Sequence, residues 1–535
     1  MDKLFFNGRI MTMDMTCPAA EAALVRDGRF AAVGTLEEVQ AAAAADAERI
    51  DLQGAAVYPG LMDSHLHILN KAIAAGELEL GGERRRAEVL TAVAQRASEL
   101  PEDSAVEGRG FNQDLWDDRR LVTRRELDEA APKHPVRLTR ICGHMVIANS
   151  AAMAQAGIDP KTAVPAGGEV DWEQGVFSEN AINLLYPADR DAGVEACAAL
   201  LYRGMSIAAD AGLTAIFSDD FGTGGYSMHT VAAAYRLLEA QGRMPVRVVQ
   251  QCALPDDASW QEFVDAGFAY GQGSDMYRIG PRKLYSDGSL GARTAWLSVP
   301  YADAPDRRGV PIYAQEQLNH LGAQAHAAGM PFIVHAIGDA GAQSVVEAIL
   351  HARQAVPGTD DLPSGIVHCQ ITTPELLARI ADEHIYVYAQ PVFTEYDLHI
   401  CRDRVGAELE KSSYNWATLL HSGVCISSGS DCPVEPLDPA KNIYCAVTRK
   451  DFAHQPEGGW MPEQCLTVAE AIACHTVEAA KAIGRAADMG RIAVGCLADM
   501  TVFPEALDAI APDAILDAQP LMTVVGGMVR RCGHQ

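Results

Sequence analysis

The sequence predicts an α/β fold: a (β/α)8 TIM-like barrel, a small β-sandwich domain built from both chain ends, and an insertion over the barrel mouth. Short apolar runs alternate with helix-like segments through the middle of the chain, which is typical of parallel strands joined by helical crossovers. Polar and titratable residues stand at the carboxyl ends of these runs, the end where such barrels carry their functional groups. Both chain ends contain short strand-like runs closed by glycine or asparagine turns.

Residues 1–58 and 488–535 are expected to form the β-sandwich domain, because apolar and polar positions alternate there as in the hairpins of a small sheet. The runs are KLFFNGRIMTM, AALVRDGRFAAVG and ERIDLQGAAVYPG at the start, and GRIAVGCLADMTVF and LMTVVGGMVRR at the end.

Residues 59–487 are expected to form the barrel, with an inserted subdomain at about 70–200 where the strand–helix rhythm breaks and helical material such as ERRRAEVLTAVAQRASEL appears. The insertion is predicted to cover the barrel mouth. The strand-like runs are PGLMDSHLH, GLTAIFSDD, VRVVQQCAL, YRIGPRKLYSDG, MPFIVHAIGD, SGIVHCQ, HIYVYAQP and GVCISSGSDCP.

Composition and charge exclude several classes of partner. A net charge of -28 over 535 residues would repel phosphate backbones and anionic lipid, so we expect no nucleic-acid or membrane partner. The chain shows no basic leader followed by an apolar stretch and a cleavage site, and no uninterrupted run of about 18 apolar residues. Its 13 cysteines contain no close CxxC pairs, which suits reduced thiols. We therefore expect a cytoplasmic protein.

His65 and His67 form the sharpest chemical signal, at the end of the run PGLMDSHLH. In a strand, residues i and i+2 point to the same face, so the two imidazoles would converge at the strand's carboxyl end and could hold one metal ion. Two nearby histidines also occur for structural reasons, so the pair needs further ligands to be a metal site.

Four further residues stand at predicted strand ends: Lys283, His335, His368 and Asp431. Imidazole and carboxylate suit zinc and neighbouring metals. If Lys283 is buried, desolvation would lower its pKa, and the neutral amine could react with carbon dioxide to give a carbamate that bridges two metals. The alternatives are core histidines for His335 and His368, a turn residue ahead of Pro433 for Asp431, and a salt-bridged lysine for Lys283.

Taken in order along nearly the whole chain, several long motifs resemble the amidohydrolase superfamily, and within it the group that includes N-substituted formamide deformylases (amidohydrolase family 3). The motifs are PGLMDSHLH, GRGFNQDLW, GHMVIANSAAM, KLYSDGSLGARTAWLSVPY, HAIGDAG, GSDCPVEPLDP and GRIAVGCLADMTVF.

The resemblance implies a centre with two divalent metal ions, zinc being the first expectation, bridged by a carbamate on Lys283. Asp431 would be both ligand and catalytic base, taking a proton from the metal-activated hydroxide and passing it to the leaving nitrogen. Members often carry Glu just before the histidine of the sixth strand, where this chain has Val367. The implied ligands are His65, His67, Lys283, His335, His368 and Asp431.

A second set of residues is predicted to contact the substrate: Trp116, His144, Asn149 and Glu179 in the insertion, and Asp287 and Arg293 after Lys283. Each has a structural alternative. Trp116 could pack the insertion, and Asn149 could cap a helix. Arg293 could clamp a substrate carboxylate, or it could pair with an acidic neighbour.

The leading functional hypothesis is hydrolysis of a C–N bond in a small-molecule amide, formamide or cyclic amide. The alternative is a mononuclear metal-dependent deaminase of a ring or amidine-like substrate. The deaminases characteristically show His-x-x-Glu after the fifth strand, whereas His335 is followed by Ala336-Ile337-Gly338-Asp339. A barrel that binds without turnover is a third hypothesis. The resemblance also allows a homo-oligomer, with a dimer as the first expectation.

Overall fold

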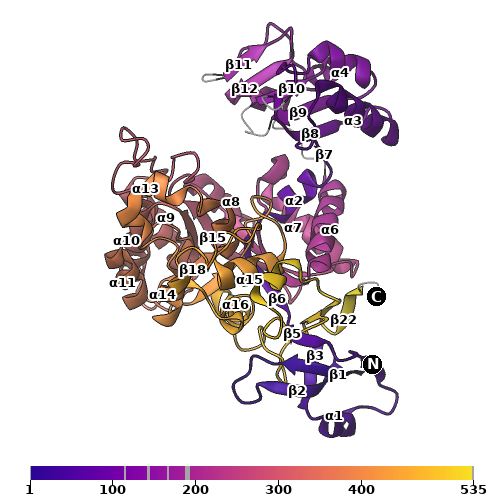
Figure 1. Ribbon diagram of the computed structural model, residues 1–535, viewed down its shortest axis with the longest axis vertical. Helices are drawn as coiled ribbons and strands as arrows, with labels where there is room; N and C mark the ends of the chain where they lie inside the picture. The colour runs from indigo at the N-terminus through magenta and orange to yellow at the C-terminus, as the bar shows by residue number, and fades with distance from the viewer. Residues whose placement is uncertain (1, 114–115, 141–144, 166–167, 187–192, 533–535) are drawn as a thin grey trace. The chain divides into compact units, whose positions relative to one another are not determined.

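The computed structural model describes residues 2–113, 116–140, 145–165, 168–186 and 193–532. The chain divides into two compact units (Figure 1). The main unit comprises Met1–Leu69, Val194–Gly222 and Met228–Gln535, and the inserted unit comprises Asn70–Gly193 and Thr223–Ser227.

The main unit contains the predicted barrel. Eight strands follow one another in chain order, each parallel to the next, which confirms the TIM-like architecture. All eight predicted runs form these strands. They are β6 (Leu61–Leu66), β13 (Leu213–Asp219), β14 (Arg247–Ala253), β15 (Tyr277–Tyr285), β16 (Phe332–Ala336), β17 (Gly365–His368), β18 (Tyr386–Ala389) and β19 (Ile426–Ser428).

The barrel closes where the chain after β19 meets the end of β6. The backbone N–H of Asp431 donates to the His65 carbonyl at 2.8 Å, and the N–H of His67 donates to the Cys432 carbonyl at 2.8 Å. The buried carboxylate of Asp63 accepts hydrogen bonds from the backbone N–H of His65 and from both the N–H and the hydroxyl of Ser430. The first and eighth strands are therefore held together at their carboxyl ends.

Helices surround the barrel, and Figure 1 shows α10, α11 and α14 outside β15 and β18. In α11, the Thr373 hydroxyl accepts from the Leu376 N–H, Pro374 occupies the first turn, and Leu376 and Ile380 are buried. The helices are α6 (Val194–Asp210), α7 (Met228–Ala240), α8 (Asp257–Asp265), α9 (Gln315–Ala327), α10 (Asp339–Ala355), α11 (Pro374–Asp382), α12 (Thr394–Asp397), α13 (Cys401–Glu410), α14 (Trp416–His421), α15 (Pro439–Thr448), α16 (Val468–Cys474) and α17 (Val477–Ala482).

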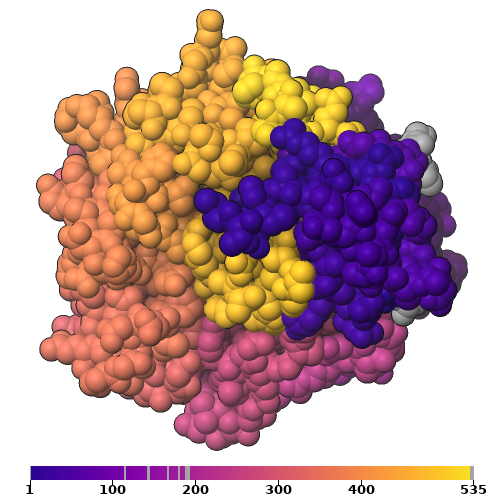
Figure 2. Space-filling view, turned by 90° about the horizontal axis from the view of Figure 1, so that it is seen from below, coloured from indigo at the N-terminus to yellow at the C-terminus, as the bar shows by residue number. Residues whose placement is uncertain are grey.

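Both chain ends contribute to one hydrogen-bonded sheet of the order β22-β21-β20-β5-β1-β2-β3, with β4 also paired to β1. Figure 2 shows the indigo N-terminal residues against the yellow C-terminal ones. The strands connect into a single sheet, and a β-sandwich is not confirmed. The elements are β1 (Lys3–Met11), β2 (Ala19–Arg26), β3 (Arg29–Gly34), α1 (Leu36–Ala42), β4 (Glu48–Asp51), β5 (Ala56–Pro59), β20 (Met500–Phe503), β21 (Met522–Val525) and β22 (Met528–Cys532).

The inserted unit holds a six-stranded sheet of the order β11-β12-β10-β9-β8-β7, which the sequence did not predict. Its strands are short and mix polar with apolar residues, so the strand signal was weak, while the predicted helix is present as α3. The elements are β7 (Leu78–Glu79), α3 (Arg86–Glu99), β8 (Val106–Phe111), α4 (Arg124–Ala130), β9 (Val136–Arg140), β10 (Met145–Ala148), α5 (Ser150–Gln155), β11 (Gly168–Asp171) and β12 (Val176–Glu179), with α2 (Ile68–Ala74) spanning the unit boundary.

Among the described residues, none of the helices combines the length and the apolar character that a membrane crossing needs.

A buried ion pair joins the barrel to the terminal sheet. Arg247 at the start of β14 donates to both carboxylate oxygens of Asp499, through Nε at 2.7 Å and through its terminal nitrogen at 2.8 Å. The side chains are only 6% and 8% exposed. Asp499 also accepts from the Gly526 N–H, before β22. The Asp499 carboxylate therefore links three parts of the main unit: its own segment before β20, the start of β14 and the turn before β22.

We predict that Asp499→Ala destabilises the protein by about 3–5 kcal/mol, because it leaves the Arg247 guanidinium buried without its partner. The measurement is the apparent midpoint of urea unfolding. Asp508→Ala is the matched control, since Asp508 pairs with Arg9 at 3.5 Å with both side chains at least half exposed, and such pairs contribute about 0–1 kcal/mol. Equal shifts in the two variants would contradict the prediction.

Candidate metal centre

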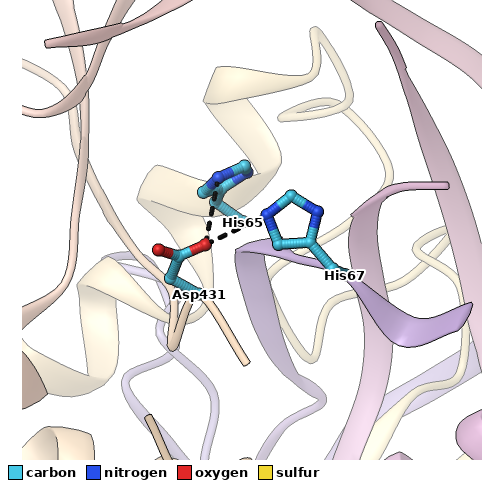
Figure 3. A group of neighbouring side chains, drawn as sticks. All are labelled: His65, His67 and Asp431. Atoms are coloured by element: carbon cyan, nitrogen blue, oxygen red, sulfur yellow. Dashed lines mark ion pairs between the residues drawn. The ribbon is translucent and has the colours of Figure 1, made fainter. Parts of the chain in front are cut away.

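The first half of the candidate centre lies where β6 and β19 meet. His65 and His67 extend from β6 toward the same carboxylate (Figure 3). The Nε2 atoms of His65 and His67 lie 3.4 and 3.2 Å from Asp431 Oδ1. Ligand atoms of all three residues lie within 4.8 Å of one another, a spacing that suits one shared metal ion.

The second half lies at the ends of β16 and β17. His368 Nε2 is 2.9 Å from His335 Nδ1, and the two ring centroids are 4.5 Å apart. The rings of His65 and His368 are separated by 5.9 Å, so the two halves adjoin. The geometry thus brings together four histidines and a carboxylate from four separate segments of the sequence.

Each histidine of the β6 half has its Nδ1 atom committed to an acceptor outside the centre. His65 Nδ1 donates to Gln251 Oε1 at 2.6 Å, and the amide of Gln251 is oriented by donation of its Nε2 to the Ser64 carbonyl. His67 Nδ1 donates to the Asp219 carbonyl at 3.1 Å. The Nε2 atom of each ring therefore faces Asp431, and it offers a lone pair to a cation whenever the ring is neutral, because a neutral imidazole carries one N–H.

The same rule holds for the other two histidines. His368 Nδ1 donates to Gln390 Oε1 at 2.8 Å, and Gln390 Nε2 donates to the Tyr388 carbonyl. His335 Nε2 donates to the Gly288 carbonyl at 3.0 Å. His368 Nε2 and His335 Nδ1 therefore present lone pairs to each other, an arrangement that a cation between them stabilises. The donor set fits a metal.

The pKa values agree with neutral imidazoles at His65, His335 and His368. Burial is the main cause that lowers the pKa of His368 to about 4 and takes those of His65 and His335 well below the usual histidine range. Burial would lower the pKa of His67 too, but the hydrogen bond and the charge of Asp431 outweigh it and raise that pKa to about 9. Burial would raise the pKa of Asp431, but the hydrogen bond with His67 and the neighbouring histidines lower it overall. Asp431 is thus an ionised carboxylate paired with a protonated His67, which must release its proton to bind a metal ion.

Lys283 stands beside the histidines at the end of β15 and is 1% exposed. Its Nζ lies 3.8 Å from the centroid of the Tyr285 ring and has no hydrogen-bond partner within the described part of the chain. Burial lowers the pKa of Lys283 to about 8, against the opposing effect of Asp219 and Asp431. A neutral amine is therefore accessible near neutral pH.

Two of the candidate metal ligands sit on unusual backbone. His368 has φ of 78° and Asp431 has φ of 55°, both in the left-handed region that non-glycine residues rarely adopt. Such conformations cost about 1–3 kcal/mol and persist where the surrounding structure enforces them. The hydrogen bonds of His368 to Gln390 and of Asp431 to the end of β6 are part of that enforcement.

Sequence reasoning missed several groups that shape the centre: Gln251, Gln390, Asp219, Tyr285 and Asp63. Asp219 ends β13 and accepts from the Tyr285 hydroxyl at 2.7 Å, while its other oxygen is buried without a partner among the described residues. Burial raises the pKa of Asp63 to about 7. Asp219 and Gln390 gave a detectable signal, because each is a polar residue at the end of a predicted strand, GLTAIFSDD and HIYVYAQP.

Asp287 and Arg293, which were predicted to contact substrate, are engaged elsewhere. The Asp287 carboxylate accepts from the backbone N–H groups of Trp296, Ile337 and Gly338. Arg293 forms a two-point ion pair with Asp303 at 2.7–3.0 Å. Arg293 therefore has the acidic partner that its structural alternative named, and the substrate roles of Asp287 and Arg293 remain predictions.

The other predicted substrate contacts belong to the inserted unit. Asn149 caps α5 and is fully buried, with its amide bonded to the backbone of Val136, Ala152 and His134. Trp116 is buried, 5.8 Å from the Phe111 ring. Their substrate roles remain predictions. His144 lies outside the described residues, and Glu179 ends β12 with its side chain outside the description.

Val367, the departure noted in the sequence, is packed in an apolar cluster with Ile333, Tyr388 and Ala482. The position before His368 therefore belongs to the barrel core.

Known proteins resemble this chain over nearly its full length. The model of the amidohydrolase family matches residues 48–530. YtcJ of Bacillus subtilis, which is named as an amidohydrolase, is 30% identical over 535 residues, with 99% of each chain covered. The N-substituted formamide deformylase of Arthrobacter pascens is 28% identical, with 99% of this chain and 98% of the deformylase covered. An uncharacterized metal-dependent hydrolase of Pyrococcus horikoshii shares the fold, with a TM-score of 0.80 at 24% identity over 96% of this chain and 99% of that chain.

We predict that Gln251→Leu and Gln390→Leu each weaken zinc affinity about 10- to 100-fold, because each removes the acceptor that fixes the tautomer of one histidine. The measurement is competition for zinc against a chromophoric chelator. Gln261→Leu is the control, since Gln261 is an exposed residue of α8 that bonds Asp265. Unchanged affinity in the first two variants would remove the glutamines from the centre.

Proposed function

The chain belongs to the amidohydrolase family, and from that premise we propose that it is a metal-dependent hydrolase that cleaves the C–N bond of a small-molecule amide, formamide or cyclic amide. The observation that carries the proposal is the shared orientation of four histidines, each with one ring nitrogen committed to an acceptor outside the centre and the other ring nitrogen directed into it. Ionised Asp431 completes a donor set with the character of a catalytic metal site.

Two divalent ions, zinc in the first instance, are proposed for this donor set. His65, His67 and Asp431 would hold one, His335 and His368 the other, and a carboxylated Lys283 both. When bound, the metal ions would lower the pKa of a water molecule and polarise the scissile carbonyl.

The environment of Lys283 supports its carboxylation. Its buried, unpartnered amine can lose its proton near neutral pH and attack the carbon of carbon dioxide. One N–C bond forms, one C–O π pair moves to oxygen, and the nitrogen gives a proton to water. The product is a carbamate whose single negative charge is shared by two oxygens, so a cationic side chain becomes an anionic one that could bridge two metal ions.

Asp431 is proposed as the catalytic base. Its lowered pKa keeps the carboxylate ionised, so it can accept a proton from the attacking water as the new C–O bond forms. It can then return that proton to the nitrogen as the C–N bond breaks, which converts a poor leaving group into an amine.

One observation favours the alternative, a mononuclear deaminase of a ring or amidine-like substrate. Asp219 and Asp431 both stabilise the ammonium form of Lys283, and an ammonium group cannot bridge two metals. In that case Lys283 would pair with carboxylates, and the centre would hold one ion near His65, His67 and Asp431.

Metal content separates these two functions. We predict about two metal ions per chain by elemental analysis of protein expressed with zinc and bicarbonate, and a clear loss in Lys283→Ala. About one ion in both proteins would favour the deaminase, and none in either would refute a metal-dependent hydrolase.

Asp431→Asn tests the base. We predict a loss of at least about 100-fold in kcat for formamide hydrolysis, measured as amine release, with little change in the far-UV circular dichroism spectrum. Asp265→Asn, at an exposed residue of α8 that accepts from Gln261, is the control and keeps its activity. A turnover rate in Asp431→Asn equal to that of the parent would show that Asp431 is not the catalytic base.

A further inference from the structure

A cavity of about 210 Å³ opens among the loops that follow β15 to β19. It adjoins the metal centre: Ile337 and Gln370 on its wall stand two residues beyond His335 and His368, and Phe393 stacks on the His368 ring with centroids 5.6 Å apart. Its volume is below the range of about 300–1,000 Å³ typical for drug-sized ligands. The cavity therefore suits one small group of a substrate held at the centre.

Gln370 presents an acceptor with no partner. Its Nε2 donates to Asp397 Oδ2 at 2.7 Å and to the Tyr414 hydroxyl at 3.2 Å, which fixes the orientation of the amide. The remaining atom, Oε1, is buried and has no hydrogen-bond partner in the part of the chain described. Gln370 is 1% exposed and lines the cavity, so its unsatisfied acceptor costs free energy that a donor bound there would recover.

The charged side chains that line the cavity are all acidic. Asp397 and Glu435 are on its wall, and none of its described lining residues is lysine or arginine. The structure gives Glu435 no ion-pair or hydrogen-bond partner among the described residues, whereas most half-buried carboxylates have one. Burial, helped by Glu395, Asp397 and Asp431, raises the pKa of Glu435 to about 8. A cation would relieve this accumulation of negative charge.

We propose that the cavity binds a small cationic nitrogen group of the substrate, an amidinium or ammonium carried on an apolar body. The inference rests on the proposed function, because it places this group beside the hydrolytic centre. Its N–H donors satisfy Gln370 Oε1 and Glu435, while Phe393 and Tyr396 contact the apolar part. A carboxylate would be repelled, and a neutral apolar group would leave both acceptors without donors.

The test compares benzamidinium with benzamide, which has nearly the same shape and no charge. We expect calorimetry at pH 8.5 to give at least about tenfold tighter binding of benzamidinium to the parent protein, as one charge-assisted hydrogen bond would provide. In Glu435→Gln the preference falls to within about threefold. Glu408→Gln, an exposed glutamate of α13, changes net charge equally and keeps the full preference.

Equal binding of the two probes to the parent, or a preference that survives in Glu435→Gln, would overturn the inference. If the circular dichroism spectrum shows that the Glu435→Gln variant is unfolded, the Asp397→Asn variant is tested in its place. The inference then requires that Asp397→Asn reduce the preference for benzamidinium over benzamide. If the protein hydrolyses neutral formamides but does not prefer benzamidinium, the assignment of the cavity is wrong and the proposed function is still supported. Binding of benzamidinium that depends on Glu435, in a protein that hydrolyses no amide, would support the assignment and refute the hydrolase.

Discussion

A neutral imidazole carries a single N–H, and the candidate centre requires that this N–H point away from it on four separate rings. The acceptors are two glutamine side chains and two backbone carbonyls. For three of the rings the acceptor lies at or just beyond the end of the adjacent strand, and for His65 it is Gln251, two strands away. Only a barrel with its register intact places all four acceptors correctly, so the fold determines the protonation pattern.

The closure of the barrel serves the same requirement. Asp431 follows β19, yet it must face His65 and His67 on β6. Asp63 and the backbone hydrogen bonds between the two segments hold the last strand against the first. The strained backbone at Asp431 is tolerated because these contacts leave it no relaxed alternative. The contacts that close the barrel between β19 and β6 are therefore the same ones that place Asp431 against the histidines.

The sequence predicted the barrel well because each strand is an apolar run that ends in a polar residue, a pattern visible without any tertiary information. It placed His65, His67, Lys283, His335 and Asp431 at strand ends by the same logic. The roles of Gln251 and Gln390 could not be found this way, because a glutamine acquires its role only from the histidine ring that contacts it in the folded barrel.

Distant partners also explain what the sequence left open or missed. The choice between a substrate clamp and an ion pair for Arg293 depended on Asp303, whose position is set by a loop fold. The short, mixed strands of the inserted unit gain their stability from their neighbours in the sheet and carry little local propensity. In both cases the determining partner is invisible to a local pattern.

The pairing of β5 with β20 has a consequence for biosynthesis. β5 leads directly into the first barrel strand, but its antiparallel neighbour comes from the opposite end of the chain. During translation the edge of β5 that pairs with β20 stays unpaired until the ribosome has made almost the entire polypeptide. Nascent chains of this protein thus expose an unfinished sheet for most of their synthesis, and that edge is where chaperones would be needed.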